Sequence, residues 1–196
     1  TLTVNVAPAV TTNPISQSVC SGSAVSFIAA GSGTPAPTYQ WQVSTIAIPA
    51  FTNIGGATAA TYTIAATTVA MNSNQYRCVL TNTCGSVNTT AATLTVNSSV
   101  TVTTNPVNST ICEGTGTSFT AAASGSGLNY QWEFSTNGGT SWANVVNSAV
   151  YSGATTATLT LTNTPPTLNG YLYRCNITSP PCTPGITTSA LLTVNT

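Results

Sequence analysis

The chain has 196 residues, which fits one large domain or two of about 100 residues, and it carries two Lys or Arg, two Asp or Glu and no His. General acid–base catalysis needs a His, a paired carboxylate or a tuned Lys, and metal sites need clustered carboxylates, His or Cys. We therefore expect no enzyme activity, no cofactor and no metal site. Two Arg form no basic patch for a nucleic acid, and no run of about 20 apolar residues predicts a membrane span.

The first predicted element is a short strand at residues 1–7. Its segment Thr1-Leu2-Thr3-Val4-Asn5 recurs as Thr93-Leu94-Thr95-Val96-Asn97 and again as Leu192-Thr193-Val194-Asn195. The two later copies each close a domain, so residues 1–7 read as a supernumerary strand. Alternation places Leu2, Val4 and Val6 on one apolar face.

Three interpretations of residues 1–7 are open. The strand could complete a sheet edge in a second copy of the chain, and such a head-to-tail contact builds a filament if it does not close. Leu2, Val4 and Val6 would then be the polymerisation residues, and the main partner would be the chain itself. Alternatively, the segment belongs to a longer tandem array cut inside a preceding repeat, or it is a frayed tail.

Short strands follow along the first copy, each marked by alternating apolar and polar residues and bounded by Gly, Pro or Asn. None of the segments shows a sustained helical period. The predicted inward-facing positions are Val25, Phe27 and Ala29, then Tyr39, Trp41 and Val43, then Tyr62 and Ile64, then Tyr76, Cys78 and Leu80, and finally Leu94 and Val96.

The second half repeats the first in the same order. Tyr39-Gln40-Trp41 matches Tyr130-Gln131-Trp132, Tyr76-Arg77-Cys78 matches Tyr173-Arg174-Cys175, and Asn137-Gly138 adds a hairpin turn. The sequence predicts an all-β protein of two tandem β-sandwiches. The expected boundaries are residues 8–97 for the first domain and 98–196 for the second.

These motifs resemble immunoglobulin-like (Ig-like) domains. Tyr39-Gln40-Trp41 is similar to strand C with its core Trp, and Tyr76-Arg77-Cys78 is similar to the tyrosine corner of strand F. The Thr-rich style is similar to Ig-like repeats of secreted bacterial cell-surface, adhesin and fibre proteins. The resemblance implies an extracellular structural or adhesive role without catalytic residues.

The chain departs from that family at the usual inter-sheet disulfide. Ala29 stands where the first Cys is common, and Ala121 is its counterpart in the second copy. The Asp of the corner is replaced by Asn72 and Asn169. The usual disulfide therefore does not carry over.

Six Cys without a CxxC pair suit an oxidising compartment. A bridge from Cys78 to Cys84 would have to span roughly 20 Å of extended strand, whereas one from Cys20 to Cys78 needs less distortion. An end-to-end bridge between neighbouring domains, from Cys20 to Cys182, is a third option. All six cysteines are disulfide candidates: Cys20, Cys78, Cys84, Cys112, Cys175 and Cys182.

The few remaining chemical groups have structural interpretations. We expect Arg174 to face Glu133 across two strands as a surface ion pair, and Arg77 to meet only Gln42. Phe51 and Trp142 occupy matched positions after strand C, where packing is favoured over a carbohydrate-stacking platform.

Covalent glycans are a further expected partner, because a chain with so little charge needs another means of staying dispersed. Acceptor triplets for N-linked glycans stand at Asn88, Asn97, Asn108 and Asn176. The sequence thus favours a segment of an extracellular bacterial filament, with an adhesin stalk or a carbohydrate- or protein-binding module as the alternative.

Overall fold

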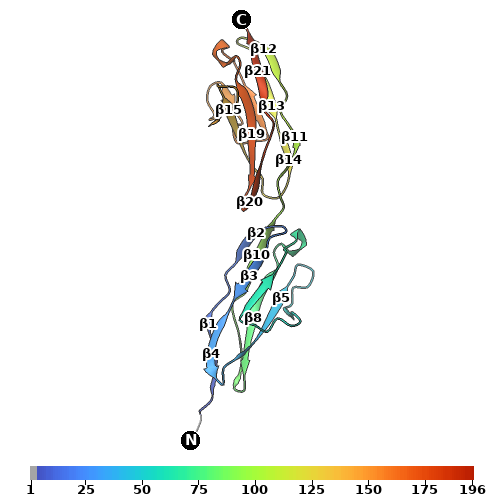
Figure 1. Cartoon of the computed structure of the whole chain (residues 1–196), viewed down its shortest axis with the longest axis vertical. Coiled ribbons are helices and arrows are strands. Elements are labelled where there is room, and N and C mark those ends of the chain that lie inside the picture. The colour runs from blue at the N-terminus through green and yellow to red at the C-terminus, as the bar shows by residue number, and fades with distance from the viewer. Residues whose placement is uncertain (1–3) are drawn as a thin grey trace. The chain divides into compact units, whose positions relative to one another are not determined.

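The computed structural model describes residues 4–196, and it divides the chain into two compact units, Thr1–Asn97 and Ser98–Thr196. Each unit is an all-β sandwich whose only helical segments, in the described part, are single short turns. The predicted fold class, two tandem Ig-like sandwiches, is confirmed (Figure 1).

The described residues of unit 1, 4–97, form ten strands and one 3₁₀ turn. In chain order these are β1 (Val6–Thr12), β2 (Gln17–Cys20), β3 (Val25–Ile28), β4 (Ala30–Thr34), β5 (Thr38–Ser44), β6 (Thr52–Asn53), β7 (Thr61–Ile64), η1 (Val69–Met71), β8 (Gln75–Asn82), β9 (Gly85–Asn88) and β10 (Ala92–Asn97).

One sheet of unit 1 has the order β2-β10-β8-β5-β6, with β9 also paired to β8. The strand β2 runs parallel to β10, so that Cys20 lies beside Asn97. The other side of the unit is formed by the pairs β1-β4 and β3-β7. The predicted strands around Phe27, Trp41, Tyr62 and Cys78 are all present as strands.

Unit 2 repeats this arrangement with eleven strands and one 3₁₀ turn. They are β11 (Thr101–Thr104), β12 (Ser109–Cys112), β13 (Thr117–Thr120), β14 (Ala122–Ser124), β15 (Asn129–Ser135), β16 (Ala143–Asn144), β17 (Tyr151–Ser152), β18 (Thr158–Leu161), η2 (Pro166–Leu168), β19 (Leu172–Ser179), β20 (Cys182–Ile186) and β21 (Ala190–Asn195).

The sheets of unit 2 follow the same register as those of unit 1. The order β12-β21-β19-β15-β16 matches its counterpart, and Cys112 lies beside Asn195 as Cys20 does beside Asn97. The predicted turn at Asn137-Gly138 joins β15 to β16, with Gly138 at a φ of 69°. Its loop is longer than a two-residue hairpin because β16 begins only at Ala143.

Each core is organised around one buried Trp. Trp41 and Trp132 are both fully buried, and each indole N–H donates to a backbone carbonyl, of Ala59 and Thr156 respectively, at 2.9 Å. Buried indoles need such a partner. Next to them a Phe stacks on the Tyr of the corner, with ring centroids 4.8 Å apart in unit 1 and 5.0 Å apart in unit 2.

The two Asn residues that replace the corner Asp hold the closing strands. Asn72 Oδ1 accepts the N–H of Val96 at 2.9 Å, and Asn169 Oδ1 accepts that of Val194 at 3.0 Å. In this chain the amide oxygen of Asn therefore accepts the backbone N–H without the negative charge of a carboxylate.

The leading segment does not behave as a free donor strand. Val6 and Ala7 belong to β1, and Val6 pairs with Thr34 of β4 in its own unit. Val4 precedes the strand and is 70% exposed, while Leu2 lies outside the described residues. The prediction that residues 1–7 form a separate strand is therefore wrong at Val6 and Ala7, because their backbone groups already have a partner strand.

Candidate functional site

Chemically active side chains are rare in this chain, and one group of them lies on the β15–β19 face of unit 2. Glu133 and Arg174 are directly opposite each other in the register, and Arg174 Nε lies 2.7 Å from Glu133 Oε2. The Arg174 guanidinium carbon also lies 4.1 Å from the centre of the Trp142 ring. The predicted ion pair is confirmed.

Unit 1 carries the uncharged version of the same group. Arg77 Nε donates to Gln42 Oε1 at 2.8 Å, and its guanidinium carbon lies 4.1 Å from the centre of the Phe51 ring. The predicted contact of Arg77 with Gln42 is confirmed, but Gln42 is not its sole partner, because the guanidinium also lies over Phe51. In both units an Arg guanidinium lies over one face of the aromatic ring, as the favoured packing interpretation of Phe51 and Trp142 requires.

The mid-strand cysteines Cys78 and Cys175 are buried free thiols. Ala29 and Ala121 lie in the same cores, where the small side chain replaces a second Cys. Burial raises the pKa of the Cys175 thiol to about 11 and also raises the pKa of Cys78. Both thiols are therefore protonated and unreactive at neutral pH. A bridge from Cys20 to Cys78 is excluded, as is one from Cys78 to Cys84.

The other four cysteines lie at the ends of the units and differ in oxidation state. Cys20 and Cys182 are disulfide-bonded. Cys84 and Cys112 are free and exposed. Of the six disulfide candidates, the structure thus places two in disulfides and leaves four as thiols.

The N-linked acceptor triplets differ in accessibility. Asn88 and Asn108 are exposed, whereas Asn97 and Asn176 are half-buried. Asn108 is in addition engaged, because its Oδ1 accepts the N–H of Leu191 at 2.8 Å. Asn88 is therefore the acceptor that the fold leaves most accessible.

Two sets of polar contacts have no counterpart among the sequence predictions. Thr89 Oγ1 accepts the buried N–H of Cys78, and Thr187 Oγ1 accepts that of Cys175, both at 2.9 Å. Asn13 and Asn105 accept the N–H groups of Thr90 and Thr188 in the same matched way, at 2.8 Å. The repeated Thr-Thr and Thr-Thr-Asn-Pro segments could have revealed these contacts, since each occurs at equivalent places in both copies.

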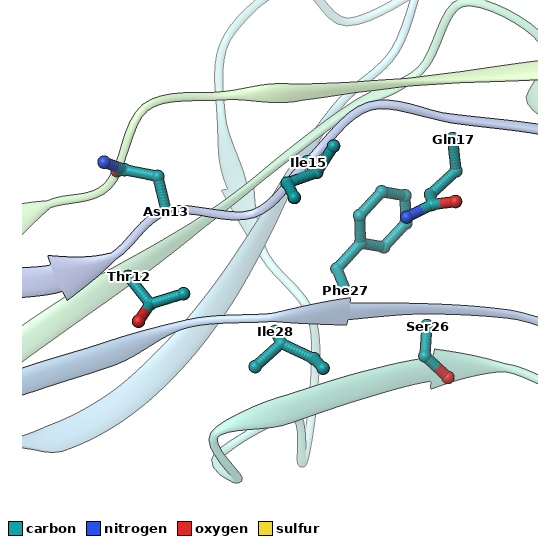
Figure 2. A pocket seen from close by; sticks show the side chains of 7 residues that line it. All are labelled: Thr12, Asn13, Ile15, Gln17, Ser26, Phe27 and Ile28. Atoms are coloured by element: carbon teal, nitrogen blue, oxygen red, sulfur yellow. The ribbon is translucent and has the colours of Figure 1, made fainter.

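An open pocket of about 190 Å³ lies on unit 1 between the segment that joins β1 to β2 and the strand β3. Figure 2 shows the Phe27 ring pointing toward the segment that carries Ile15 and Gln17. Its lining residues carry no charge: Thr12, Asn13, Ile15, Gln17, Ser26, Phe27 and Ile28. It offers apolar contact through Ile15 and Ile28 and no group suited to catalysis.

The described part of the chain was compared with the requirements of a metal site and of a membrane-spanning helix. Residues 4–196 contain no group of three or more His, Cys, Asp or Glu that could hold a metal ion. Nor does any helix among them have the length and apolar character to cross a membrane.

Solved structures that resemble this chain include tandem Ig domains. The I-band fragment I67–I69 of titin has a TM-score of 0.71 at 17% identity, over 96% of this chain and 65% of that one. Extracellular domains 3–5 of Drosophila OTK have a TM-score of 0.64 at 16% identity, over 96% of this chain and 62% of that one. At such identities the likeness shows the fold alone.

Sequence similarity links the chain to a bacterial protein and to a domain family. It is 39% identical to Endoglucanase C of Cellulomonas fimi over 123 residues. These residues make up 62% of this chain but only 11% of that protein. The chain thus spans a small part of this relative. A family profile, described as "Domain of unknown function (DUF8696)", matches residues 10–98 and 101–196. With nearly every residue of both units matched, the chain belongs to this family and carries two of its domains in tandem.

Proposed function

We propose that the chain is a non-catalytic structural segment of an extracellular bacterial surface protein, in which Ig-like units joined in series form a stalk or filament. The observation that carries this proposal is the state of the end cysteines. Cys20 and Cys182 are disulfide-bonded, and each lies at an end of a strand, Cys20 at the end of β2 and Cys182 at the start of β20. Disulfides persist mainly in oxidising, extracellular compartments.

The polar side chains support a structural role. Both Arg residues are engaged within their own unit, by Gln42 and Phe51 in one and by Glu133 and Trp142 in the other. The buried Thr hydroxyls and the Asn amides bond to backbone groups that the strands leave unpaired. These polar side chains thus stabilise the sandwich of the unit to which each belongs.

The bacterial relative supports an accessory role. Its name describes an endoglucanase, and this chain matches only 11% of it. A matched segment of 123 residues within a much longer protein fits a spacer between functional parts. Assembly by exchange of residues 1–7 receives no support, since Val6 pairs within its own unit. Serial joining of units is the route that we propose instead.

Electron microscopy of producing cells tests the proposal. Antibodies to the chain should label intact cells, and the labelled structures should extend from the surface. A strand such as β8 spans eight residues, or roughly 26 Å at about 3.3 Å per residue. Deleting unit 2 from the full-length protein should therefore shorten its reach by at least about that length.

Two results would overturn the proposal. One is labelling that appears only after the cells are lysed. The other is a deletion that leaves the reach of the protein unchanged but abolishes the binding of a soluble ligand, which would instead assign the units to the binding-module class. Deleting unit 1 in a parallel strain is the matched control, and it should shorten the protein equally.

A further inference from the structure

Unit 1 carries a run of exposed apolar residues in the loop that follows β5. Residues 46–50, with the sequence Ile-Ala-Ile-Pro-Ala, are all exposed, and we call them the apolar loop. Ile46 is 79% exposed and Ile48 is 55% exposed. Single exposed apolar residues are ordinary on a protein surface, but a run of five is not. Exposed apolar surface of this kind marks a contact with a partner.

The apolar loop is a defined turn. The N–H of Thr45 donates to the carbonyl of Ile48 at 2.9 Å, and the N–H of Ile48 donates to Thr45 Oγ1 at 3.0 Å. Ser44 Oγ donates to the carbonyl of Pro49 at 2.9 Å. These bonds hold the turn in one conformation before any partner arrives, so that little conformational entropy is lost on binding.

Unit 2 shows that the fold does not require an apolar loop at this place. The flanking strands pair in the same register in both units, Val43 with Thr52 and Phe134 with Ala143, so the two loops have equal length. The five equivalent residues of unit 2, 137–141, are Asn-Gly-Gly-Thr-Ser. A polar turn therefore fits between these strands, and folding does not account for the apolar residues of unit 1.

The pocket beside β3 offers a matching apolar surface on the same unit. Ile15 and Ile28 lie on the two segments that bound it, and both side chains are more than half exposed (Figure 2). Its volume of about 190 Å³ is smaller than the roughly 300–1,000 Å³ of small-molecule sites. The pocket therefore suits one or two apolar side chains of a protein partner.

The apolar loop does not fill the pocket of its own unit. The loop follows β5, which belongs to the β2-β10-β8-β5-β6 sheet, whereas the pocket lies against β3, which pairs with β7. Neither the loop nor the pocket lining contains a charged residue, so no charge on either surface repels a second copy that brings the two together.

We propose that unit 1 carries a self-association site, in which the apolar loop of one chain inserts its isoleucines into the pocket on unit 1 of a second copy. The contact is heterologous, because it joins two different surfaces of the unit. It goes beyond the proposed structural role and does not depend on it.

Sedimentation equilibrium of the purified chain measures the association. The contact is small, so the concentration series should reach about 1 mM. The average mass should rise with concentration, and it should rise equally in about 1 M NaCl because an apolar contact is not screened. A mass of 19.8 kDa at every concentration would overturn the proposal.

Two variants remove one surface each. The loop variant replaces residues 46–50 with the Asn-Gly-Gly-Thr-Ser of unit 2, and the pocket variant is I15T/I28T, which places at position 28 the Thr that unit 2 has at Thr120. Each should weaken self-association by about tenfold or more, the factor that burial of one Ile supplies. The control Val146→Thr removes an exposed apolar side chain from unit 2 and should leave the association unchanged.

A mixing experiment tests the pairing of loop with pocket. The loop variant keeps the pocket and the pocket variant keeps the loop, so each should be monomeric alone and the mixture should form 1:1 heterodimers. A mixture that stays monomeric would refute the pairing, as would a pocket variant that still associates with itself through its loops. The measurement uses the purified chain, so its failure is distinct from failure of the surface-labelling experiment.

Discussion

The buried hydroxyl of Thr187 should be essential for the stability of unit 2, although it lies outside every predicted motif. Its side chain is 4% exposed, and Oγ1 accepts the buried N–H of Cys175 at 2.9 Å. Cys175 is the register partner of Trp132 in the middle of the sheet. Replacing Thr187 with Val keeps the shape but removes the acceptor, so that this N–H is left in the core without a partner.

A buried donor without a partner costs about 1–3 kcal/mol. For a unit of this size, each kcal/mol lowers the melting temperature by roughly 4–8 °C. The neighbouring Thr188 is exposed, so Thr188→Val makes the same chemical change without leaving a buried N–H group unpaired. Its effect should stay within about 0.5 kcal/mol.

Urea unfolding of the full chain, followed by Trp fluorescence, measures both variants. Native-state hydrogen exchange adds a specific readout, because the Cys175 amide should exchange faster in T187V and unchanged in T188V. Thr89→Val should reproduce the loss in unit 1, where Thr89 Oγ1 accepts the N–H of Cys78. Equal stabilities for T187V and T188V would refute the reasoning.

Two further substitutions probe the charged and titratable groups of unit 2. E133Q gives unit 2 the Gln–Arg contact of unit 1, so it should cost no more than about 1 kcal/mol, and the loss should shrink in about 1 M salt as the ion pair is screened; a larger cost that ignores salt would contradict this. Burial raises the pKa of Cys175 from 9.0 to about 11, so the folded state favours the neutral thiol. Its contribution to stability is complete below pH 9 and is lost as the pH rises toward 11, so urea midpoints should fall over that range and fall less in C175A. Parallel curves for the two proteins would count against this assignment.

The core and the charged contacts were open to prediction because they follow from alternation and register. Once Trp132 and Cys175 are placed opposite each other, the adjacent residues Glu133 and Arg174 must also face each other, on the outer side of the sheet. The internal repeat then fixes the equivalent contact of Gln42 with Arg77.

The partner of the leading segment was not open to prediction because β4 carries no readable pattern. Its sequence, Ala-Gly-Ser-Gly-Thr, reads as a loop. A Cβ on Gly31 would lie 2.9 Å from the carbonyl oxygen of Ala9, so β1 and β4 approach too closely for a larger side chain. Gly31 permits the pairing of β4 with β1, but glycine is also typical of loops. The sequence of β4 therefore does not indicate a strand, and residues 6–7 have no recognisable partner in the sequence.

The oxidation states of the cysteines do not follow from the sequence around each one. Cys20 and Cys112 stand in matched turns, yet one is disulfide-bonded and the other is free. The alignment of the repeats identifies equivalent positions. It does not say which of them is oxidised.

A stepwise count of thiols by alkylation and intact mass tests most directly the account of two sandwiches in which Cys20 and Cys182 are oxidised and the core cysteines are free thiols. In the native protein two thiols, Cys84 and Cys112, should react; unfolding without reduction should raise the count to four, and reduction to six. Six reactive thiols before reduction would remove the disulfides from the account. Protection of Cys78 or Cys175 after unfolding would show instead that the bridges lie within the cores.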